Sequence, residues 1–398
     1  MKNILVLTYW SFREGLIQSY TLPYLFIISK YLKGGKIYLV TLEKEDIALS
    51  PNEMSDAKTN LEKYNIQLIA LKYRSLSLGV IFIWINEIFN LSRFIRKNKI
   101  NTIHAWCTPA GLIGYILSIM NKIPLILDSF EPHAEAMVEN GSWRKTSFSF
   151  RFLFFFEKIQ AQRAIHVIAA NKGMFEYSFK KYGVKLKSFH VKPACVDIEK
   201  FGDKNVRYLK SRLGLNGKVT CVYAGKIGGI YLDEELFTFF KRASIFWKDN
   251  FKVLLLTNEK DTVVNRWVDK VGLNPKIILK QFIHFDQIHE YFALADFGIT
   301  LVKPLPSKKY CTPIKDGEYW ATGLPVVITK DISNDSEIIR KNNIGYVLNS
   351  LNEYEFDRAI VKIDQLIKDK SVTTKIRDIA KRERGFHIAK KIYKEIYQ

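Results

Sequence analysis

The sequence predicts an α/β protein of two domains, each with a parallel sheet covered by helices on both faces. Short apolar runs alternate with amphipathic segments along most of the chain, which is the pattern of strand–helix–strand units. With 398 residues the chain is too long for one ordinary hydrophobic core. The alternation loosens at residues 194–212 and then restarts, so we expect a first domain at residues 1–196 and a second at 205–384.

The first half of the chain alternates expected strands and helices. Apolar runs predict the strands, and apolar residues three or four positions apart predict the helices, as with Leu16, Tyr20 and Tyr24. The strands are expected at residues 4–8, 36–41, 66–71, 102–105, 124–128, 166–169 and 188–191, and the helices at 15–32, 81–97, 111–120, 148–161 and 173–182.

The second half repeats the alternation by the same criteria. Residues 352–398 are charged and have helical spacing to the end of the chain. Strands are expected at residues 219–224, 252–257, 277–279, 297–301, 325–328 and 345–348, and further helices at 234–241, 263–271, 285–294, 313–322 and 336–341.

The most informative stretch runs from Thr312 to Val327. It predicts a short helix whose first turn is capped by Thr312 and begins with Pro313. Gly323 suits the C-terminal stop and Pro325 prevents continuation, so a buried strand follows at once.

The start of this helix is suited to bind phosphate. Free backbone N–H groups and the helix dipole attract anions there, and Lys315 adds a full positive charge. Glu318, about one turn in, can accept hydrogen bonds from sugar hydroxyls. An ordinary capped helix of an α/β domain would show the same local pattern, and these residues alone leave both interpretations open.

Composition indicates a globular protein of a reducing compartment. Hydrophobic residues make up 47% of the chain and charged residues 25%, which excludes a disordered chain. The four cysteines lie far apart, which argues against a zinc site or a disulfide framework. The first apolar run is short and strand-like, unlike a signal peptide, and no apolar run reaches the length of a membrane span. We therefore expect a cytoplasmic protein.

The formal charge of +21 indicates anionic partners. Residues 141–200 hold twelve Lys or Arg and four acids, with phenylalanines interleaved among the basic side chains. Such a segment can rest on an anionic membrane, and we expect its start, near Phe148, to make peripheral contact at the cytoplasmic face. A core helix with solvated basic residues is the alternative, and we favour it for residues 154–156.

The stretch from Thr312 to Val327 also resembles a family segment. Retaining glycosyltransferases of family 4, which have the two-Rossmann-domain GT-B fold, carry roughly Pro-x-Lys-x-x-Glu-Tyr-x-Ala-x-Gly-x-Pro-Val-Val where they bind the nucleotide sugar. The resemblance implies that Glu318 holds the ribose of the donor and that Thr312 and Pro313 face its diphosphate. The matching residues are Pro313, Lys315, Glu318, Tyr319, Ala321, Gly323, Pro325, Val326 and Val327.

The same resemblance implies an architecture for the whole chain. Two Rossmann-like domains would face each other across a cleft, the first on the acceptor side and the second binding the nucleotide-sugar donor. A last helix, about residues 385–398, would pack back on the first domain.

Ligands of open parallel sheets bind beyond the carboxyl ends of the strands, and the resemblance assigns roles there. A glycine after the first strand lies against the donor diphosphate in the family, and this role falls on Gly15. The family's Gly-(Arg/Lys) pair, which contacts and neutralises the diphosphate, matches Gly225 and Lys226. Contacts to the nucleobase are implied for Asn258 and for the backbone near Ile283.

The loop after residues 124–128 holds four ionisable side chains, from Asp128, Glu131, His133 and Glu135. In the family this loop often supplies a histidine or an acid near the reacting sugar and the acceptor. We expect His133 and Glu131 to position the acceptor hydroxyl or to remove its proton. A lone histidine in a loop is also often an ordinary surface residue, and the sequence leaves that alternative open.

The chain departs from the family pattern in several places. The usual Gly-Gly of the first loop is reduced to Gly15, and Tyr231 lies where a second phosphate-binding cation is expected. A cation must stabilise the leaving diphosphate, and Lys303 is our candidate for that charge, with Lys315 and Lys308 as alternatives. Tyr310 replaces a glutamate that the family often has. No Asp-x-Asp motif is present, and we expect neither a metal nor a cofactor.

These features predict a retaining glycosyltransferase that moves a sugar from a nucleoside diphosphate to an acceptor hydroxyl. The basic, aromatic segment favours a glycan or lipid-linked saccharide acceptor, as in surface-polysaccharide assembly. A nucleotide-sugar epimerase or a phosphorylase on the same fold, a non-catalytic GT-B scaffold and a basic nucleic-acid-binding protein remain alternatives. The chain shows no recognisable nucleic-acid-binding motif, so we expect no specific nucleic-acid partner. The sugar, the base and the acceptor stay open.

Overall fold

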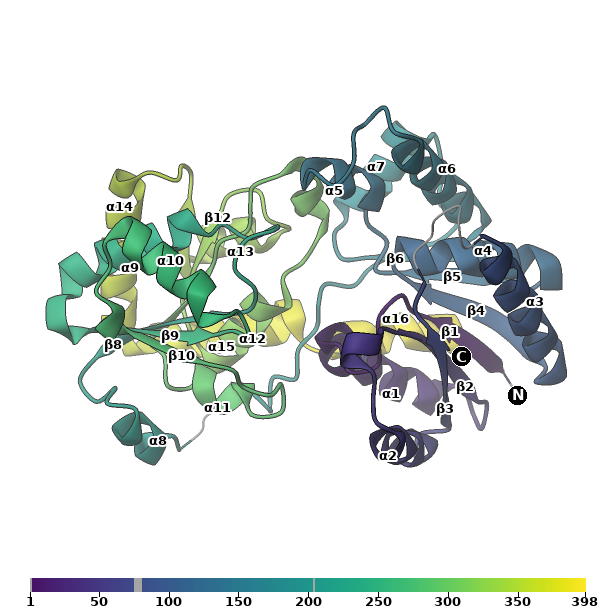
Figure 1. Ribbon diagram of the computed structural model, residues 1–398, viewed down its shortest axis with the longest axis horizontal. Coiled ribbons are helices and arrows are strands. Elements are labelled where there is room, and N and C mark those ends of the chain that lie inside the picture. Colours follow the sequence, from purple (N-terminus) through teal and green to yellow (C-terminus); the bar gives the residue numbers. More distant parts are fainter. Residues whose placement is uncertain (1, 75–80, 203–204) are drawn as a thin grey trace. The chain divides into compact units, whose positions relative to one another are not determined.

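The computed structural model describes residues 2–74, 81–202 and 205–398. The chain forms two compact units: unit 1 is Met1–Pro193 with His387–Gln398, and unit 2 is Ala194–Phe386. Each unit is built on one parallel sheet with helices packed against it (Figure 1). The predicted fold class, two Rossmann-like α/β sheets, is confirmed.

Unit 1 is built on a seven-stranded sheet of order β3-β2-β1-β4-β5-β6-β7, in which all neighbours are parallel. Residues 4–7 of β1 are fully buried, as expected for a strand covered on both faces. Each strand predicted in this half lies within two residues of its expected ends. The strands are β1 (Asn3–Leu7), β2 (Ile37–Glu43), β3 (Ile66–Lys72), β4 (Ile100–Trp106), β5 (Leu125–Asp128), β6 (His166–Ala169) and β7 (Phe189–Val191).

The helices of unit 1 include two that the hydrophobic pattern did not predict, α2 and α5. The sequence signal for α2 is a capping box, in which Ser50 and Glu53 bond each other's backbone N–H groups. The helix expected at residues 15–32 is divided into a π-helical turn (Leu16–Thr21) and α1 (Leu22–Tyr31). The others are α2 (Pro51–Glu62), α3 (Ile81–Lys97), α4 (Thr108–Asn121), α5 (His133–Glu139), α6 (Phe148–Arg163), α7 (Gly173–Tyr182) and α16 (His387–Tyr397).

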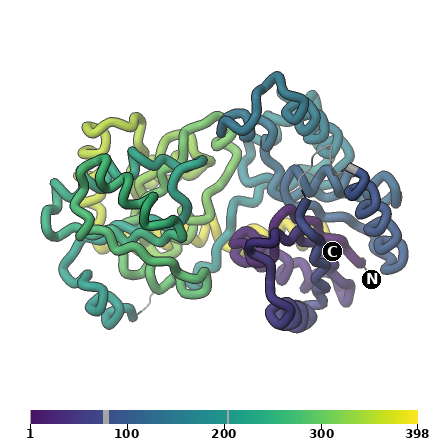
Figure 2. The backbone as a smooth tube through the Cα atoms, viewed as in Figure 1, coloured from purple at the N-terminus to yellow at the C-terminus, as the bar shows by residue number. Residues whose placement is uncertain are grey.

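The C-terminal helix α16 belongs to unit 1, where it packs on α1. The tube in Figure 2 shows this yellow segment among the purple N-terminal elements. Tyr393 and Tyr397 are buried there, and the Lys2 ammonium donates a hydrogen bond to the carbonyl oxygen of Tyr397 at 3.1 Å. The two ends of the chain are therefore tied together within one unit.

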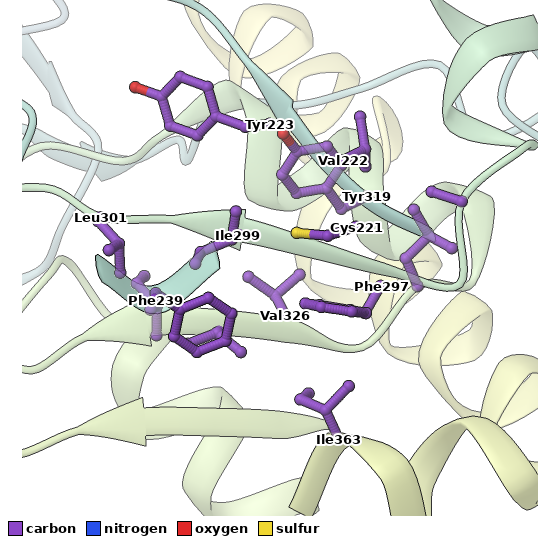
Figure 3. Packing of buried hydrophobic residues seen from close by; sticks show 14 of the residues in the cluster. Cys221, Val222, Tyr223, Phe239, Phe297, Ile299, Leu301, Tyr319, Val326 and Ile363 are labelled. Atoms are coloured by element: carbon purple, nitrogen blue, oxygen red, sulfur yellow. The ribbon is translucent and has the colours of Figure 1, made fainter. Parts of the chain in front are cut away.

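Unit 2 repeats the same plan with a six-stranded sheet of order β10-β9-β8-β11-β12-β13, again with parallel neighbours. Its apolar core is drawn in Figure 3, where Phe239 of α9, Ile363 of α14 and Phe297 of the sheet pack together. The strands are β8 (Val219–Ala224), β9 (Phe251–Leu256), β10 (Ile278–Gln281), β11 (Phe297–Thr300), β12 (Val326–Thr329) and β13 (Gly345–Leu348).

The helices of unit 2 follow the predicted alternation except for α8, which lies in the region 194–212 where no helix was expected. The charged C-terminal region is divided between α14 and α15 of this unit and α16 of unit 1. In the described parts of the chain, no helix is both long enough and apolar enough to cross a bilayer. The helices are α8 (Arg207–Arg212), α9 (Glu234–Trp247), α10 (Asp261–Val271), α11 (Ile288–Phe292), α12 (Ile314–Thr322), α13 (Asp335–Asn342), α14 (Glu353–Lys368) and α15 (Lys370–Arg384).

Both sheets have a point at which the strand order reverses. In unit 1 it lies between β1 and β4, and in unit 2 between β8 and β11. The loops that leave two such strands turn to opposite faces of the sheet, which leaves a crevice at their carboxyl ends where ligands of open α/β sheets bind. The carboxyl edge of each sheet, around these strands, is therefore where functional residues are expected.

Candidate functional site

Gly225 follows β8 at the reversal point of unit 2 and has a φ of +132°, a conformation that only glycine adopts easily. A β-carbon on this residue would lie 2.2 Å from Lys315 Nζ, so the absence of a side chain makes room for the lysine head group. The ammonium of Lys315 also lies 4.2 Å from the ring centroid of Tyr231. The glycine loop and the predicted phosphate-binding helix thus meet at one point.

The loops after β8 and β11 are held together by their backbones. The N–H of Leu232 donates to the carbonyl oxygen of Leu301, and the N–H of Lys303 donates to that of Ile230, each at 2.9 Å. Lys303 therefore lies beside the part of the loop where the expected second cation is missing. Lys226 is exposed in the same loop.

Helix α12 is positioned against the sheet by Tyr319. Its hydroxyl accepts a hydrogen bond from the N–H of Ala224 at 3.1 Å, at the end of β8. Its ring lies over Gly298 of β11, where a β-carbon would come within 2.6 Å of the ring. This tyrosine is fully buried, so its place in the sequence motif has a structural reason.

The first turn of α12 differs from the prediction. The helix begins at Ile314 with Pro313 as its N-cap residue, and no side chain caps it. The hydroxyl of Thr312 is hydrogen-bonded at 2.9 Å to the hydroxyl of Ser333, which follows β12. The expected Thr312 cap is therefore wrong, because this hydroxyl pairs with a neighbouring loop. Pro313, the N-cap residue, has no side-chain acceptor to offer to the first N–H groups of α12.

Glu318 lies on α12 one turn after Lys315 and is partly buried. No hydrogen bond from a described residue reaches its carboxylate. Burial raises the pKa of Glu318 to about 7, while the positive charges of Lys315 and Lys200 lower it. Sequence reasoning missed Lys200, which lies more than a hundred positions away and whose ammonium is 3.5 Å from the carbonyl oxygen of Phe285.

The two residues expected at the nucleobase follow neighbouring strands. Asn258 is exposed just beyond β9, next to Thr257, whose N–H donates to the carbonyl oxygen of Gln281 at 2.9 Å. Ile283 follows β10 and packs partly against the core. Both lie on loops at the carboxyl edge that also holds Gly225.

In unit 1, Gly15 stands just before the π-helical turn that follows β1. Its φ is −55°, a conformation open to any residue, and a β-carbon there would meet nothing within 4 Å. The glycine is therefore not required by local geometry. Its loop is held by Glu14, whose carboxylate accepts from the N–H of Ser11 at 3.1 Å and pairs with the ammonium of Lys44 at 2.9 Å.

Glu131 and His133 follow β5 and lie together. The Nδ1 atom of His133 is 3.5 Å from Oε1 of Glu131, and both side chains are about one-third exposed at 31% and 33%. His133 is the first residue of α5, so it lies at a helix start that the sequence did not predict. The carboxylate of the buried Glu157 accepts the N–H of Ala134 at 2.8 Å and thereby holds this first turn.

The other two acids of that loop point elsewhere. Asp128 is buried, 3.0 Å from the ammonium of Lys192, and accepts a hydrogen bond from the Tyr393 hydroxyl at 2.7 Å. Burial alone would raise the pKa of Asp128. The charge of Lys192 and the hydrogen bonds that the Asp128 carboxylate accepts hold this pKa below its usual range. Glu135 pairs with Lys181 at 3.4 Å. Only Glu131 and His133 therefore remain as a candidate pair.

Comparison with known proteins adds a family and a fold. Residues 255–392 match the family described as the glucosyltransferase 3-like, C-terminal domain. The matched part includes α12 with Lys315 and Glu318. The comparison with curated proteins found no match.

Several solved structures share the whole architecture. HepE of Anabaena, solved in complex with UDP-glucose, is 17% identical over 100% of this chain and 99% of its own, with a TM-score of 0.73. A glycosyltransferase from Rickettsia africae is 14% identical over 100% and 98%, with a TM-score of 0.72. WaaG, a glycosyltransferase involved in lipopolysaccharide biosynthesis, is 13% identical over 99% of both chains, with a TM-score of 0.70. The chain has the GT-B fold of these glycosyltransferases.

Proposed function

We propose that this protein is a retaining glycosyltransferase that uses a nucleoside-diphosphate sugar. One observation carries the proposal: Lys315 projects from the first turn of α12 to the loop after β8, where Gly225 leaves space for its ammonium, and Glu318 follows one turn later on the same helix. A cation and a helix N-terminus suit a diphosphate, and a carboxylate one turn away suits the two hydroxyls of a ribose.

Unit 2 would bind the donor. The N–H groups that start α12, near Thr312 and Pro313, would face the diphosphate, and Lys315, Lys226 and Lys303 would neutralise it. These cations act when the bond between the anomeric carbon and the diphosphate oxygen breaks, because negative charge then grows on the leaving group. Glu318 would hold the ribose, and the loops of Asn258 and Ile283 would contact the base.

Unit 1 would bind the acceptor. The pair of Glu131 and His133, 3.5 Å apart, can orient a hydroxyl and accept its proton as the new glycosidic bond forms. For retention, the acceptor oxygen must attack from the face that the diphosphate leaves. The exposed loop at Gly15 would lie against the same diphosphate.

The acceptor would be a glycan or lipid-linked saccharide at a membrane surface. Phe148, Phe152 and Phe155 repeat at helical spacing on α6 and are 68%, 39% and 55% exposed, so the core position expected for residues 154–156 is wrong for Phe155. Phe150 and Leu153 of the same helix are buried. Exposed phenylalanines beside basic side chains suit peripheral contact with an anionic membrane at its cytoplasmic face.

Binding of UDP, GDP, ADP and CMP to the purified protein, measured by calorimetry, tests the donor site. We expect micromolar binding of one nucleotide, lost in Glu318→Ala but kept in Glu337→Ala, an exposed glutamate of α13. Binding of none of the four, or equal binding by both variants, would refute the proposal. Formation of an epimerised sugar nucleotide without an acceptor would favour the epimerase alternative.

A further inference from the structure

Arg384 is a buried cation at the end of α15, with 1% of its side chain exposed. Its guanidinium reaches three segments of unit 2. One nitrogen donates to the carbonyl oxygen of Ala194 at 2.8 Å, and another donates to that of Pro313 at 3.0 Å and to the carboxylate of Asp335 at 2.6 Å. Arginine suits this place because its planar head is always charged and presents several donors in fixed directions.

The contact with Pro313 bears directly on the start of α12. Pro313 is the N-cap residue of that helix, so the position of its peptide decides where the following N–H groups point. Gly317 brings α12 close to the arginine: a β-carbon there would lie 3.0 Å from Val196 Cγ1 and 3.4 Å from Arg384 Cγ. Helix α12 therefore rests on Arg384 without an intervening side chain.

The neighbouring acids explain why the arginine stays in place. Asp335 begins α13 and pairs with the guanidinium, and the fully buried Asp316 lies beside it on α12. Burial and the charge of Asp335 raise the pKa of Asp316. The buried guanidinium of Arg384 is paired with the buried carboxylate of Asp335.

A second arginine of α15 holds the opposite end of α12. The side chain of Arg377 donates to the carbonyl oxygen of Thr322 from two nitrogens, at 3.3 and 3.0 Å. It lies two turns before Arg384 on the same helix. The chain thus offers two comparable contacts to α12, and only one of them is at the phosphate-binding end.

We propose that Arg384 is a positioning residue for the donor diphosphate: it fixes the peptide of Pro313 and so aims the first N–H groups of α12 at the phosphates. The inference rests on the proposed function. The positioning role predicts a defect in phosphate binding alone, because the base and the ribose would be contacted by other residues. Removing the arginine should weaken binding of a nucleoside diphosphate more than binding of the nucleoside alone.

The test measures the dissociation constants of UDP and uridine for the wild type, Arg384→Lys and the double variant Arg384→Met/Asp335→Asn. The double variant removes both charges, so no lone buried ion is left if the single variant fails to fold. We expect binding of UDP to weaken at least ten-fold and binding of uridine to change less than two-fold. The donor KM should rise more than kcat falls. Arg377→Lys, the matched control, should bind both ligands as the wild type does.

The outcomes separate the two proposals. A wild type that binds none of UDP, GDP, ADP and CMP refutes the proposed function itself. If the wild type binds GDP instead of UDP, the test uses GDP and guanosine in place of UDP and uridine. If the wild type binds the diphosphate and the folded Arg384 variants bind it equally well, the positioning role is overturned. It is also overturned if these variants lose affinity for the nucleoside and for the diphosphate to the same extent. An equal defect in Arg377→Lys overturns it as well.

Discussion

The ammonium of Lys315 lies where a side chain on Gly225 would be, because a β-carbon built there would stand 2.2 Å from Lys315 Nζ. The two residues come from different elements, the loop after β8 and the first turn of α12. Their contact joins the two parts of the proposed phosphate site within unit 2.

Gly225→Ala should abolish nucleotide binding, since the added methyl group displaces Lys315. Gly229→Ala is the matched control: this residue of the same loop also has a positive φ, +67°, but a β-carbon there would meet nothing within 4 Å. Both variants carry backbone strain of about 1 kcal/mol or more. Calorimetry should detect no binding to Gly225→Ala and near-normal binding to Gly229→Ala, and similar affinities for both would contradict the assignment.

Binding of the nucleoside should depend on pH through Glu318. Its pKa is raised to about 7 by burial, so at pH 6 only about a tenth of the molecules carry the ionised form, against about nine tenths at pH 8. In the proposed donor site, the ionised carboxylate would accept hydrogen bonds from both ribose hydroxyls. Uridine, which has no phosphate that titrates, should therefore bind several-fold more tightly at pH 8 than at pH 6. Glu318→Gln should remove this dependence, and an unchanged pH profile in the variant would argue against the ribose role.

Glu157 should make unit 1 less stable as the pH rises. Burial raises its pKa from 4.5 to about 7, although the Ala134 N–H and the Tyr182 hydroxyl lower it. A folded-state pKa above the unfolded one contributes stability that is fully present below pH 4.5 and is lost as the pH rises through about 7. The free energy of unfolding of Glu157→Gln, relative to that of the wild type, should therefore increase by about 2–3 kcal/mol from pH 5 to pH 8. Urea unfolding of both proteins checks this, with the exposed Glu62→Gln as a control that should show no such gain.

Replacing His133 should slow sugar transfer without affecting the donor. We expect His133→Ala to lower kcat by about a hundred-fold, because a positioned base contributes at least that much. The dissociation constant of the nucleotide should not change, since His133 lies in unit 1 and the proposed donor residues other than Gly15 lie in unit 2. Wild-type turnover in this variant would remove the histidine from the mechanism.

The exposed face of α6 should bind anionic vesicles. Phe148→Ser with Phe155→Ser should reduce binding to vesicles that contain an anionic lipid by about ten-fold or more, because each buried ring contributes roughly 1–2 kcal/mol. Phe246→Ser on α9, which removes a phenylalanine 45% exposed in unit 2, is the matched control. Sedimentation with vesicles measures the difference, and equal binding by all variants would place the membrane contact elsewhere.

The fold was predictable because its signals are local. Apolar runs mark the strands, and the residues between Thr312 and Val327 carry a helix start, a helix stop and a strand in one stretch. The π-helical turn before α1 was not predictable, because its apolar spacing also fits an ordinary helix. The start of α5 at His133 depends on the distant carboxylate of Glu157, which no local pattern indicates.

By itself, the sequence determined the alternation of strands and helices, the motif of α12 and the identity of the candidate residues, since each of these depends on neighbours along the chain. The tertiary structure alone decided which side chains meet. It turned Asp128 inward to Lys192, placed Lys200 near Glu318 and set Arg384 under the start of α12. These pairs are 64, 118 and 71 positions apart, counted from their residue numbers. Only the packing of helices on a sheet brings such residues together, because side-chain contact depends on distance in space, which local periodicity does not encode.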